Sequence, residues 1–147
     1  MIDDIKIQLR SVRFEQMEIE MLIEQSLRIQ SQLESVTSQL RDVCVQTGIE
    51  SPDTFADRVD ALISLNKAIA ERVEVLTERQ EKLFKLVAEL ENPQHRAVLE
   101  KYYLFPEHVG ITWEEVAEQI GYTGRQIRRI HGTALQELRK RVKESEM

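Results

Sequence analysis

Four polar side chains near the carboxyl end of the chain have the chemistry needed to read the edges of nucleic-acid bases: Arg125, Gln126, Arg128 and Arg129. An arginine can donate two parallel hydrogen bonds to guanine, and a glutamine can form a matching pair with adenine. Ile127 and Ile130 alternate with these side chains at a helical spacing. If the isoleucines face a core, the arginines and the glutamine must point outward or sideways from the same helix.

The elements that would position these side chains are two short helices joined by a tight turn. Thr112 is a good N-cap, and Glu115, three residues later, completes a capping box. Gly121 stands where the turn requires a positive φ angle, and Thr123 caps the next helix. Ala117 is small enough to let the two helices cross closely. This spacing predicts a helix-turn-helix whose second helix carries the arginines in its first two turns, the part that enters the major groove of DNA.

The charge of the chain is distributed unevenly. The whole sequence has a formal net charge of -6, and residues 1–92 hold 11 Lys+Arg against 18 Asp+Glu. Residues 121–143 hold seven basic residues against Glu137 alone. Arg139, Lys140, Arg141 and Lys143 lie late in this segment, where we expect them to contact phosphates or nothing specific. An acidic chain that gathers positive charge on one helix indicates DNA contact on that helix.

The alternative interpretation is that the arginines form an ordinary solvated helix face. However, Arg125, Arg128 and Arg129 are placed near the N-terminus of their helix, where the helix dipole disfavours cations. A helix that accepts this cost has another use for them, and we therefore favour DNA contact. His131 follows on the same helix and could contact a phosphate, but we expect it to be simply exposed.

Two long helices precede this segment, over residues 2–47 and 52–91. Gly48 is expected to end the first, and Ser51 and Pro52 to begin the second. Both carry apolar residues at seven-residue intervals, in two registers each. The first helix has Val12, Ile19, Ser26, Leu33 and Leu40 with Glu15, Leu22, Ile29, Val36 and Val43; the second has Val59, Asn66, Val73, Gln80 and Val87 with Leu62, Ile69, Leu76, Leu83 and Leu90. The fold class is therefore predicted to be all-α, a long antiparallel helical hairpin (coiled coil) followed by a small three-helix bundle with a helix-turn-helix.

We expect two domains, an oligomerisation hairpin over 1–91 and a DNA-binding bundle over 92–147. Asn92 can cap the first helix of the bundle, and Pro93 suits its first turn. Several apolar residues of the hairpin fall outside both stripes: Met17, Met21, Ile23, Leu27, Ile63, Leu65, Val75 and Phe84. A hairpin alone would leave many of them in water, so we predict a homodimer or higher oligomer formed through residues 1–91.

Other classes of protein are disfavoured by what the sequence lacks. The three histidines are scattered, no cysteine or carboxylate cluster has metal spacing, and no glycine-rich phosphate loop is present. We therefore expect no enzyme, no catalytic residue, no metal and no cofactor. No apolar run reaches the ~20 residues of a membrane span, and no signal peptide is visible. The expected location is the cytoplasm, without membrane contact.

Residues 93–141, and above all the stretch "WEEVAEQIGYTGRQIRRIHGTALQELRK", resemble region 4 of sigma-70-type transcription factors. A long hairpin followed by such a segment is also similar to small phage and prophage transcription regulators of the ArpU/RinA kind. The resemblance implies a regulator of late phage genes in a bacterial host cell that binds double-stranded DNA and has no catalytic activity. Region 2 of a full sigma factor, which melts the promoter, has no counterpart here.

The resemblance also assigns positions to DNA contact. Thr123, Arg125, Gln126, Arg128 and Arg129 fall where the family contacts DNA, and Thr112 falls where a phosphate is usually held. Gly124 departs from the family, which often has a polar residue there.

A protein-interaction adaptor is the alternative function. The hairpin could bind a partner protein, with RNA polymerase as a candidate, and the bundle could serve as a docking piece. A phage DNA-packaging component is a further option, although in such proteins the DNA-binding segment generally precedes the oligomerising helices.

Overall fold

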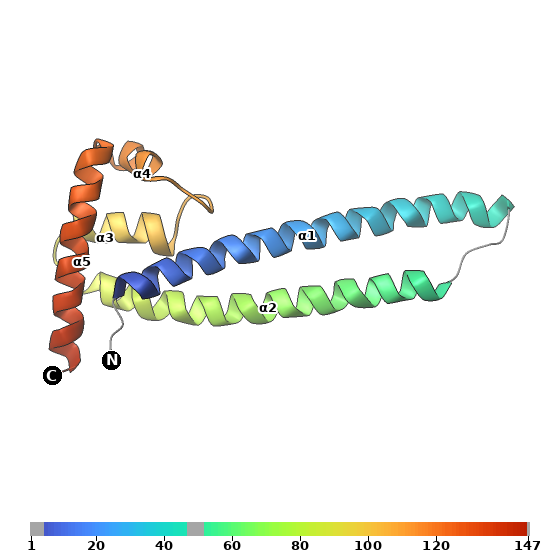
Figure 1. Cartoon of the computed structure of the whole chain (residues 1–147), viewed down its shortest axis with the longest axis horizontal. Coiled ribbons are helices and arrows are strands. Elements are labelled where there is room, and N and C mark those ends of the chain that lie inside the picture. Colours follow the sequence, from blue (N-terminus) through green and yellow to red (C-terminus); the bar gives the residue numbers. More distant parts are fainter. Residues whose placement is uncertain (1–4, 47–51, 147) are drawn as a thin grey trace. The chain divides into compact units, whose positions relative to one another are not determined.

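The structure, a computed structural model, describes residues 5–46 and 52–146, with side chains for 5–39 and 54–145, and every regular element in these residues is a helix. The elements are α1 (Ile5–Gln46), α2 (Pro52–Ala88), α3 (Pro93–Leu99), the π-helical turn η1 (Glu100–Leu104), α4 (Trp113–Ile120) and α5 (Gly124–Glu146) (Figure 1). The all-α prediction, a long helical hairpin followed by a helix-turn-helix, is confirmed. The expected roles of Gly48 and Ser51, and of the Leu40 and Val43 side chains, lie outside the described residues.

No helix in this part of the chain is long and apolar enough to cross a membrane. Backbone contacts divide the chain into two compact units. Unit 1 comprises Met1–Met17 and Val75–Met147, and unit 2 comprises Glu18–Glu74. The base of the hairpin therefore belongs to the same unit as the helix-turn-helix, whereas the sequence suggested a boundary between residues 91 and 92.

Unit 2 is the part of the hairpin between Glu18 and Glu74. Ile19, Ser26 and Leu33 of α1 and Ile69 of α2 are buried, as the seven-residue repeat predicts. The other register of each helix is more exposed: Leu22, Ile29 and Val36 of α1 are half-buried, and Asn66 and Val73 of α2 are exposed. Two helices can fully bury only the residues between them, so the flanking register remains at the edge of the seam.

Polar contacts reinforce the seam of unit 2. The Ser26 hydroxyl donates a hydrogen bond to Asn66 Oδ1. Arg72 Nη1 lies 2.6 Å from Glu18 Oε1 in an exposed ion pair. An exposed ion pair contributes at most about 1 kcal/mol, so this part of the hairpin is held mainly by its apolar register.

Unit 1 has a larger core built from all of its helices. Its largest fully buried side chains come from the start of α1, the end of α2, the bundle and the loop before α4: Ile5, Leu9, Val12, Val87, Val98, Leu99, Leu104, Ile111, Val116, Ile127 and Leu138. Asn92 caps α3 as predicted, accepting a hydrogen bond of 2.9 Å from the backbone N–H of Gln94. The first helix of the bundle is divided into α3 and η1.

Side chains of the hairpin hold the carbonyl groups around η1. Gln16 Nε2 donates to the carbonyl oxygens of Tyr103 and Leu104, each at 3.0 Å, and Gln80 Nε2 donates to Leu104 at 3.1 Å. Arg13 donates to the carbonyl oxygens of Tyr102 at 3.0 Å and of Ile111 at 2.6 Å. The last carbonyls of a helical segment have no partner within that segment. These three side chains therefore complete the backbone hydrogen bonding of the turn that leads to α4.

Candidate nucleic-acid interface

The helix-turn-helix consists of α4 and α5, joined at Gly121. Gly121 has φ 87°, in the left-handed region, and its backbone N–H bonds to Ala117. Val116, Ala117 and Ile127 are buried in one cluster with residues of α3 and of the preceding loop. The predicted roles of Ala117, Gly121 and Ile127 are therefore confirmed. Ile130, also expected to face inward, is half-buried.

Arg125 and Arg129 project from the outer face of α5. Both side chains are exposed, whereas Ile127 between them is completely buried. Because the two arginines are four residues apart, they lie on the same face of the helix. Among the described residues, no ion pair or side-chain hydrogen bond engages either guanidinium group. These two cations are available to an external ligand without loss of an internal contact.

Arg128 lies to the side of that face and pairs with α4. Its Nη2 is 2.7 Å from Glu114 Oε1, and the two side chains are 60% and 66% exposed. Such a pair is weak in water and can exchange for a stronger anion. Gly124 is close to the same carboxylate: a Cβ there would lie 3.8 Å from Glu114 Oε1, an ordinary contact. Space therefore does not require a glycine at this position.

Gln126 and Thr123 form a capping box at the start of α5. Thr123 Oγ1 accepts a hydrogen bond of 3.2 Å from the backbone N–H of Gln126, and Gln126 Oε1 accepts one of 3.0 Å from the backbone N–H of Thr123. The predicted cap at Thr123 is confirmed. The role of Gln126 in it was missed, although a Thr followed three residues later by Gln is a known signal. Reading adenine with both polar atoms would require Gln126 to leave this box.

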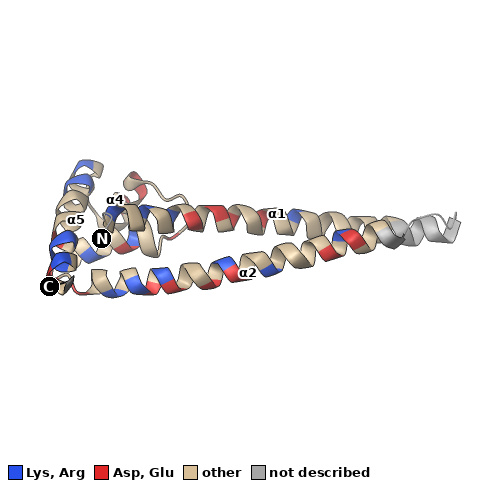
Figure 2. Ribbon diagram, turned by 60° about the horizontal axis from the view of Figure 1, so that its bottom comes forward, with Lys and Arg blue, Asp and Glu red and all other residues tan. Residues whose placement is uncertain are grey.

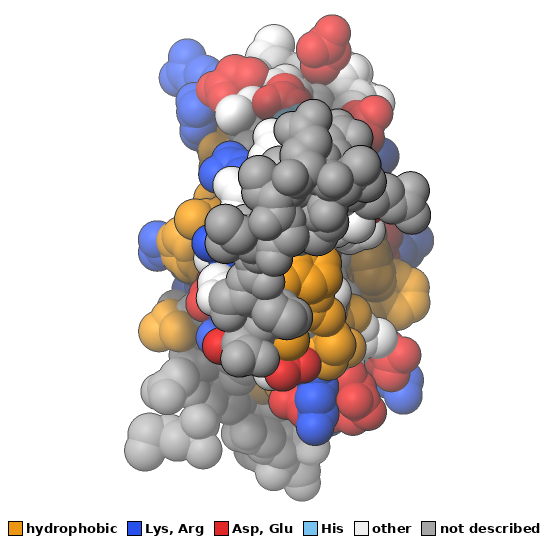
Figure 3. Space-filling view, turned by 90° about the vertical axis from the view of Figure 1, so that its right-hand side faces the viewer, with side chains coloured by type: hydrophobic (Ala, Val, Ile, Leu, Met, Phe, Trp, Pro, Cys, Tyr) orange, Lys and Arg blue, Asp and Glu red, His pale blue; other side chains and the backbone are white. Residues whose placement is uncertain are grey.

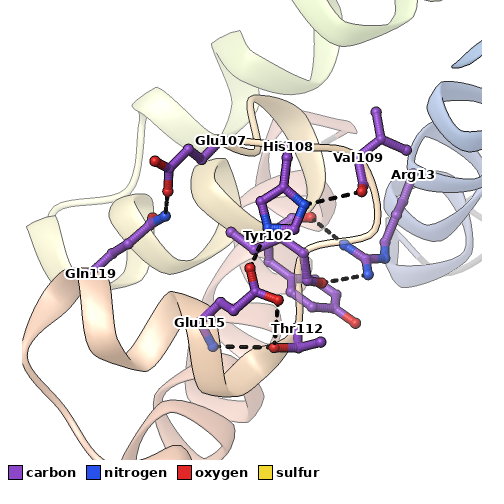
Figure 4. Close-up of polar contacts among 9 residues, drawn as sticks. Arg13, Tyr102, Glu107, His108, Val109, Thr112, Glu115 and Gln119 are labelled. Atoms are coloured by element: carbon purple, nitrogen blue, oxygen red, sulfur yellow. Dashed lines mark hydrogen bonds and ion pairs between the residues drawn. The ribbon is translucent and has the colours of Figure 1, made fainter.

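Thr112 is the N-cap of α4, and its hydroxyl donates a hydrogen bond of 3.2 Å to Glu115 Oε1, so only the N-cap half of the predicted capping box forms (Figure 4). The backbone N–H of Glu115 donates to Thr112 Oγ1 at 3.2 Å, as predicted. Glu115 also contacts His108, which lies in the loop before α4. This contact raises the pKa of His108 and lowers the pKa of Glu115, because each group stabilises the charged form of the other. The start of α4 is thus fixed by its own side chains.

The basic residues of α5 form two groups, one near each end of the helix (Figure 2). In the group nearer the carboxyl end, Lys140 Nζ lies 3.4 Å from Glu137 Oε1, and Arg141 Nη2 lies 3.3 Å from Glu91 Oε1. These carboxylates partly neutralise the second group. The group that contains Arg125 and Arg129 therefore provides the more available positive charge.

An aromatic cluster, Tyr102, Tyr103, Trp113 and His131, supports the inner side of α5. The rings of Tyr102 and Trp113 stack at 3.6 Å between centroids with an interplanar angle of 4°, and the ring centroids of Trp113 and His131 are 4.4 Å apart. Tyr103 Oη and His131 Nε2 are 2.8 Å apart. His131 is thus half-buried, and the expectation that it is exposed was wrong. It faces the aromatic side chains that precede α4, a contact that the spacing within α5 does not reveal.

Burial also shifts the pKa of two groups in this cluster, His131 and Tyr103. It lowers the pKa of His131 to about 4, and the nearby Lys6 and Arg139 act in the same direction. Burial raises the pKa of Tyr103 to about 12, assisted by Tyr102. Both groups are therefore neutral near pH 7 and act as packing and hydrogen-bonding groups.

The segment that contains the helix-turn-helix matches the model of one known family. Residues 92–140, about a third of the sequence, match the family model of sigma-70, region 4. No curated protein and no solved structure matches the chain. Region 4 is a DNA-binding regulatory family, not an enzyme family. The segment formed by α3, η1, α4 and most of α5 is therefore similar to a helix-turn-helix of the DNA-binding, transcription-regulating kind.

Proposed function

We propose that the protein is a sequence-specific regulator of transcription that binds double-stranded DNA through α5. The observation that carries this proposal is the exposure of Arg125 and Arg129 on the first two turns of the second helix of a region 4-like segment. In a helix-turn-helix, these turns enter the major groove. The guanidinium groups would there donate paired hydrogen bonds to guanine.

The other predicted site residues take supporting roles in this proposal. Arg128 exchanges Glu114 for a base or a phosphate, because the carboxylate holds it only in an exposed pair. Thr112 and Thr123, each at the start of a helix, lie where backbone N–H groups favour a phosphate. Gln126 reads a base only if the capping box opens.

The proposed setting is late-gene control in a phage or prophage of the ArpU/RinA kind, in the cytoplasm of a bacterial host. The similarity of residues 92–140 to region 4 supports transcription as the process, and RNA polymerase is a candidate partner. We further propose a homodimer formed through residues 1–91. Met21, Leu27 and Ile63 support it, because these hairpin side chains are 59–68% exposed. Figure 3 shows hydrophobic side chains at the surface.

Selection of bound sites from a random duplex pool tests the proposal. The purified full-length chain is expected to enrich a defined sequence, which is then used to compare variants. Arg128→Ala is expected to lose about 1–3 kcal/mol of binding free energy and to relax the preference at one base pair if Arg128 reads a base. A uniform loss on all sequences would instead assign Arg128 to a phosphate. Failure to enrich any sequence would contradict sequence-specific binding.

An interaction adaptor is the second candidate, favoured by an exposed aromatic pair. Phe84 and Phe105 are 39% and 53% exposed, and their rings meet edge to face at 5.5 Å. Exposed aromatic side chains are common at protein interfaces. This candidate predicts that the full chain binds purified RNA polymerase, that Phe84→Ser weakens this binding, and that duplex DNA is ignored.

A further inference from the structure

Gly132 lies inside α5, where a glycine weakens the helix. Glycine favours a helix interior less than any other residue except proline. The backbone conformation does not require it, because the described glycines with a positive φ angle are Gly110 and Gly121. The chain therefore bears a loss of helix stability at Gly132 without a conformational reason.

Packing within the chain does not account for the missing side chain either. Gly132 is exposed. Apart from the backbone of α5 itself, no atom of the described residues lies within 4 Å of a Cβ built there. Ala117, in contrast, is a small residue buried in the core of the helix-turn-helix. A glycine that neither conformation nor internal packing requires indicates the close approach of another molecule.

Gly132 shares its face of α5 with the two exposed arginines. It follows Arg129 by three residues and Arg125 by seven. At 3.6 residues per turn, seven residues fall only about 20° short of two full turns. Further along the same face lies Gln136, which is also exposed. Gly132 is therefore a gap in a row of long polar side chains.

The surroundings of this gap favour an anionic partner. Residues 124–136 contain three arginines and no Asp or Glu. Thr133, the next residue, donates a hydrogen bond of 3.1 Å from Oγ1 to the carbonyl oxygen of Arg129, and so keeps its side chain against the helix. The low part of the surface thus extends over two positions, and positive side chains stand beside it.

The position of the gap along α5 matches the depth of a major groove. At a rise of about 1.5 Å per residue, Gly132 lies about 10 Å beyond Arg125 along the helix axis. The major groove of DNA is about 8.5 Å deep. If the first turns of α5 reach the bases on the groove floor, Gly132 therefore comes near the rim, where the sugar–phosphate backbone runs.

We propose that Gly132 is the point of closest approach between α5 and DNA, at which the sugar–phosphate backbone at the rim of the major groove contacts the main chain of the helix. The inference rests on the proposed function and adds a positioning residue to it. Gly132 reads no base itself, because the sugar–phosphate backbone carries no sequence information directly. A side chain at this position would hold Arg125 and Arg129 away from the base edges.

The test compares stability and DNA binding in the same full-length variants, Gly132→Ala and Gly132→Leu. Both are expected to be at least as stable as wild type in urea denaturation, because both residues favour a helix over glycine and have open space. Gly132→Leu is expected to bind the selected duplex at least about 10-fold more weakly in fluorescence anisotropy, because a large side chain cannot fit into a close contact. Gly132→Ala should lose less. Ala88→Leu, which adds the same bulk at an exposed position of α2, should bind as wild type does.

The outcomes separate this inference from the proposed function. If wild type binds the selected duplex and a folded Gly132→Leu protein binds it equally well, the close approach is overturned while the proposed function stands. Equal losses in the alanine and leucine variants would also overturn it, because they would point to helix flexibility rather than to space. If wild type enriches no sequence and binds no duplex DNA, the proposed function itself fails.

Repeating the site selection with Gly132→Leu tests which part of DNA lies against the gap. The variant is expected to enrich the wild-type sequence more weakly, without a new preference. A changed preference at one base pair would place Gly132 against a base edge and overturn the assignment to the sugar–phosphate backbone. Gly132→Met provides a second large side chain for both experiments if the leucine variant does not fold.

Discussion

The polar side chains at the start of α5 differ in what they must give up to contact DNA. Among the described residues, Arg125 and Arg129 form no ion pair or side-chain hydrogen bond, whereas Arg128 must leave Glu114. Gln126 must open the capping box that begins the helix. A group that first loses an internal contact gains less from an external one. We therefore expect Arg125 and Arg129 to contribute most to base recognition.

The capping role of Gln126 gives a stability prediction. Gln126→Ala removes the acceptor of the Thr123 N–H and is expected to lower the free energy of unfolding by about 0.5–1 kcal/mol. Gln126→Glu keeps an acceptor at that place and suits the positive end of the helix, so its stability is expected to stay close to wild type. Urea denaturation measures both. Equal destabilisation by the two variants would contradict the capping box.

His131 predicts a pH dependence of stability. Its folded-state pKa is about 4, below its ordinary value of 6.5. Between these values the unfolded chain binds a proton that the folded chain does not, so the free energy of unfolding falls as pH drops from about 6.5 to about 4. The contribution of His131 is fully present above pH 6.5 and is lost as pH falls through that window.

Chemical denaturation at several pH values checks this dependence. Glutamine stays neutral at every pH, so His131→Gln should show a smaller loss of stability between pH 6.5 and 4 than wild type. If the two proteins lose stability in parallel over that range, His131 is not kept neutral by its burial.

At the scale of elements, the turn between α4 and α5 depends on Gly121. Its φ of 87° is costly for any residue with a side chain, although a Cβ there would meet nothing within 4 Å. Gly121→Ala is therefore expected to lower the free energy of unfolding by about 1–2 kcal/mol. Gly132→Ala is the matched control: it lies within α5, has open space for a Cβ, and should raise stability by up to about 1 kcal/mol. Urea denaturation of both variants gives the comparison, and a Gly121→Ala protein as stable as wild type would argue against the left-handed turn.

The sequence predicted those elements whose signals are local. Thr112, Gly121 and Thr123 act on residues within a few positions, so their types alone predict the caps and the turn of the helix-turn-helix. The outward direction of Arg125 and Arg129 followed from the buried Ile127 beside them.

The sequence did not reveal features that depend on contacts between distant segments. Arg13 meets Tyr102 and Ile111 across 89 and 98 positions, and neither its type nor its spacing indicates those carbonyl partners. The inward position of His131 depends on Tyr103 and Trp113, which belong to other elements. The contacts of Arg13 join the base of the hairpin to Tyr102 and Ile111, which helps to explain why this base belongs to unit 1.

At the scale of the whole molecule, the two ends of the hairpin are expected to have different tasks. Its base shares a core with the helix-turn-helix, whereas unit 2 leaves several apolar side chains in water. The base of the hairpin therefore helps to hold α5, the helix that carries Arg125 and Arg129. Unit 2 is the part through which we expect self-association.

Light scattering tests the predicted dimer. Leu27 and Ile63 are 59% and 60% exposed, so glutamate at both positions should leave each hairpin folded. We expect this double variant to shift the mass from dimer to monomer, because apolar contact between copies becomes charged. Ser31→Glu combined with Ser64→Glu adds the same charge at exposed polar positions and should remain dimeric. A wild-type protein that is monomeric at every concentration would contradict the prediction.

Recognition of DNA through the start of α5 is tested most directly by the affinity of one double variant. Arg125→Ala combined with Arg129→Ala is compared, by fluorescence anisotropy, with wild type and with Arg28→Ala combined with Lys67→Ala. Each base-reading arginine contributes about 1–3 kcal/mol, so the first variant should bind the selected duplex at least about 30-fold more weakly and lose its preference over random duplex. The second variant should retain both properties. If the Arg125/Arg129 variant is folded and still distinguishes the selected duplex as wild type does, α5 is not the recognition helix.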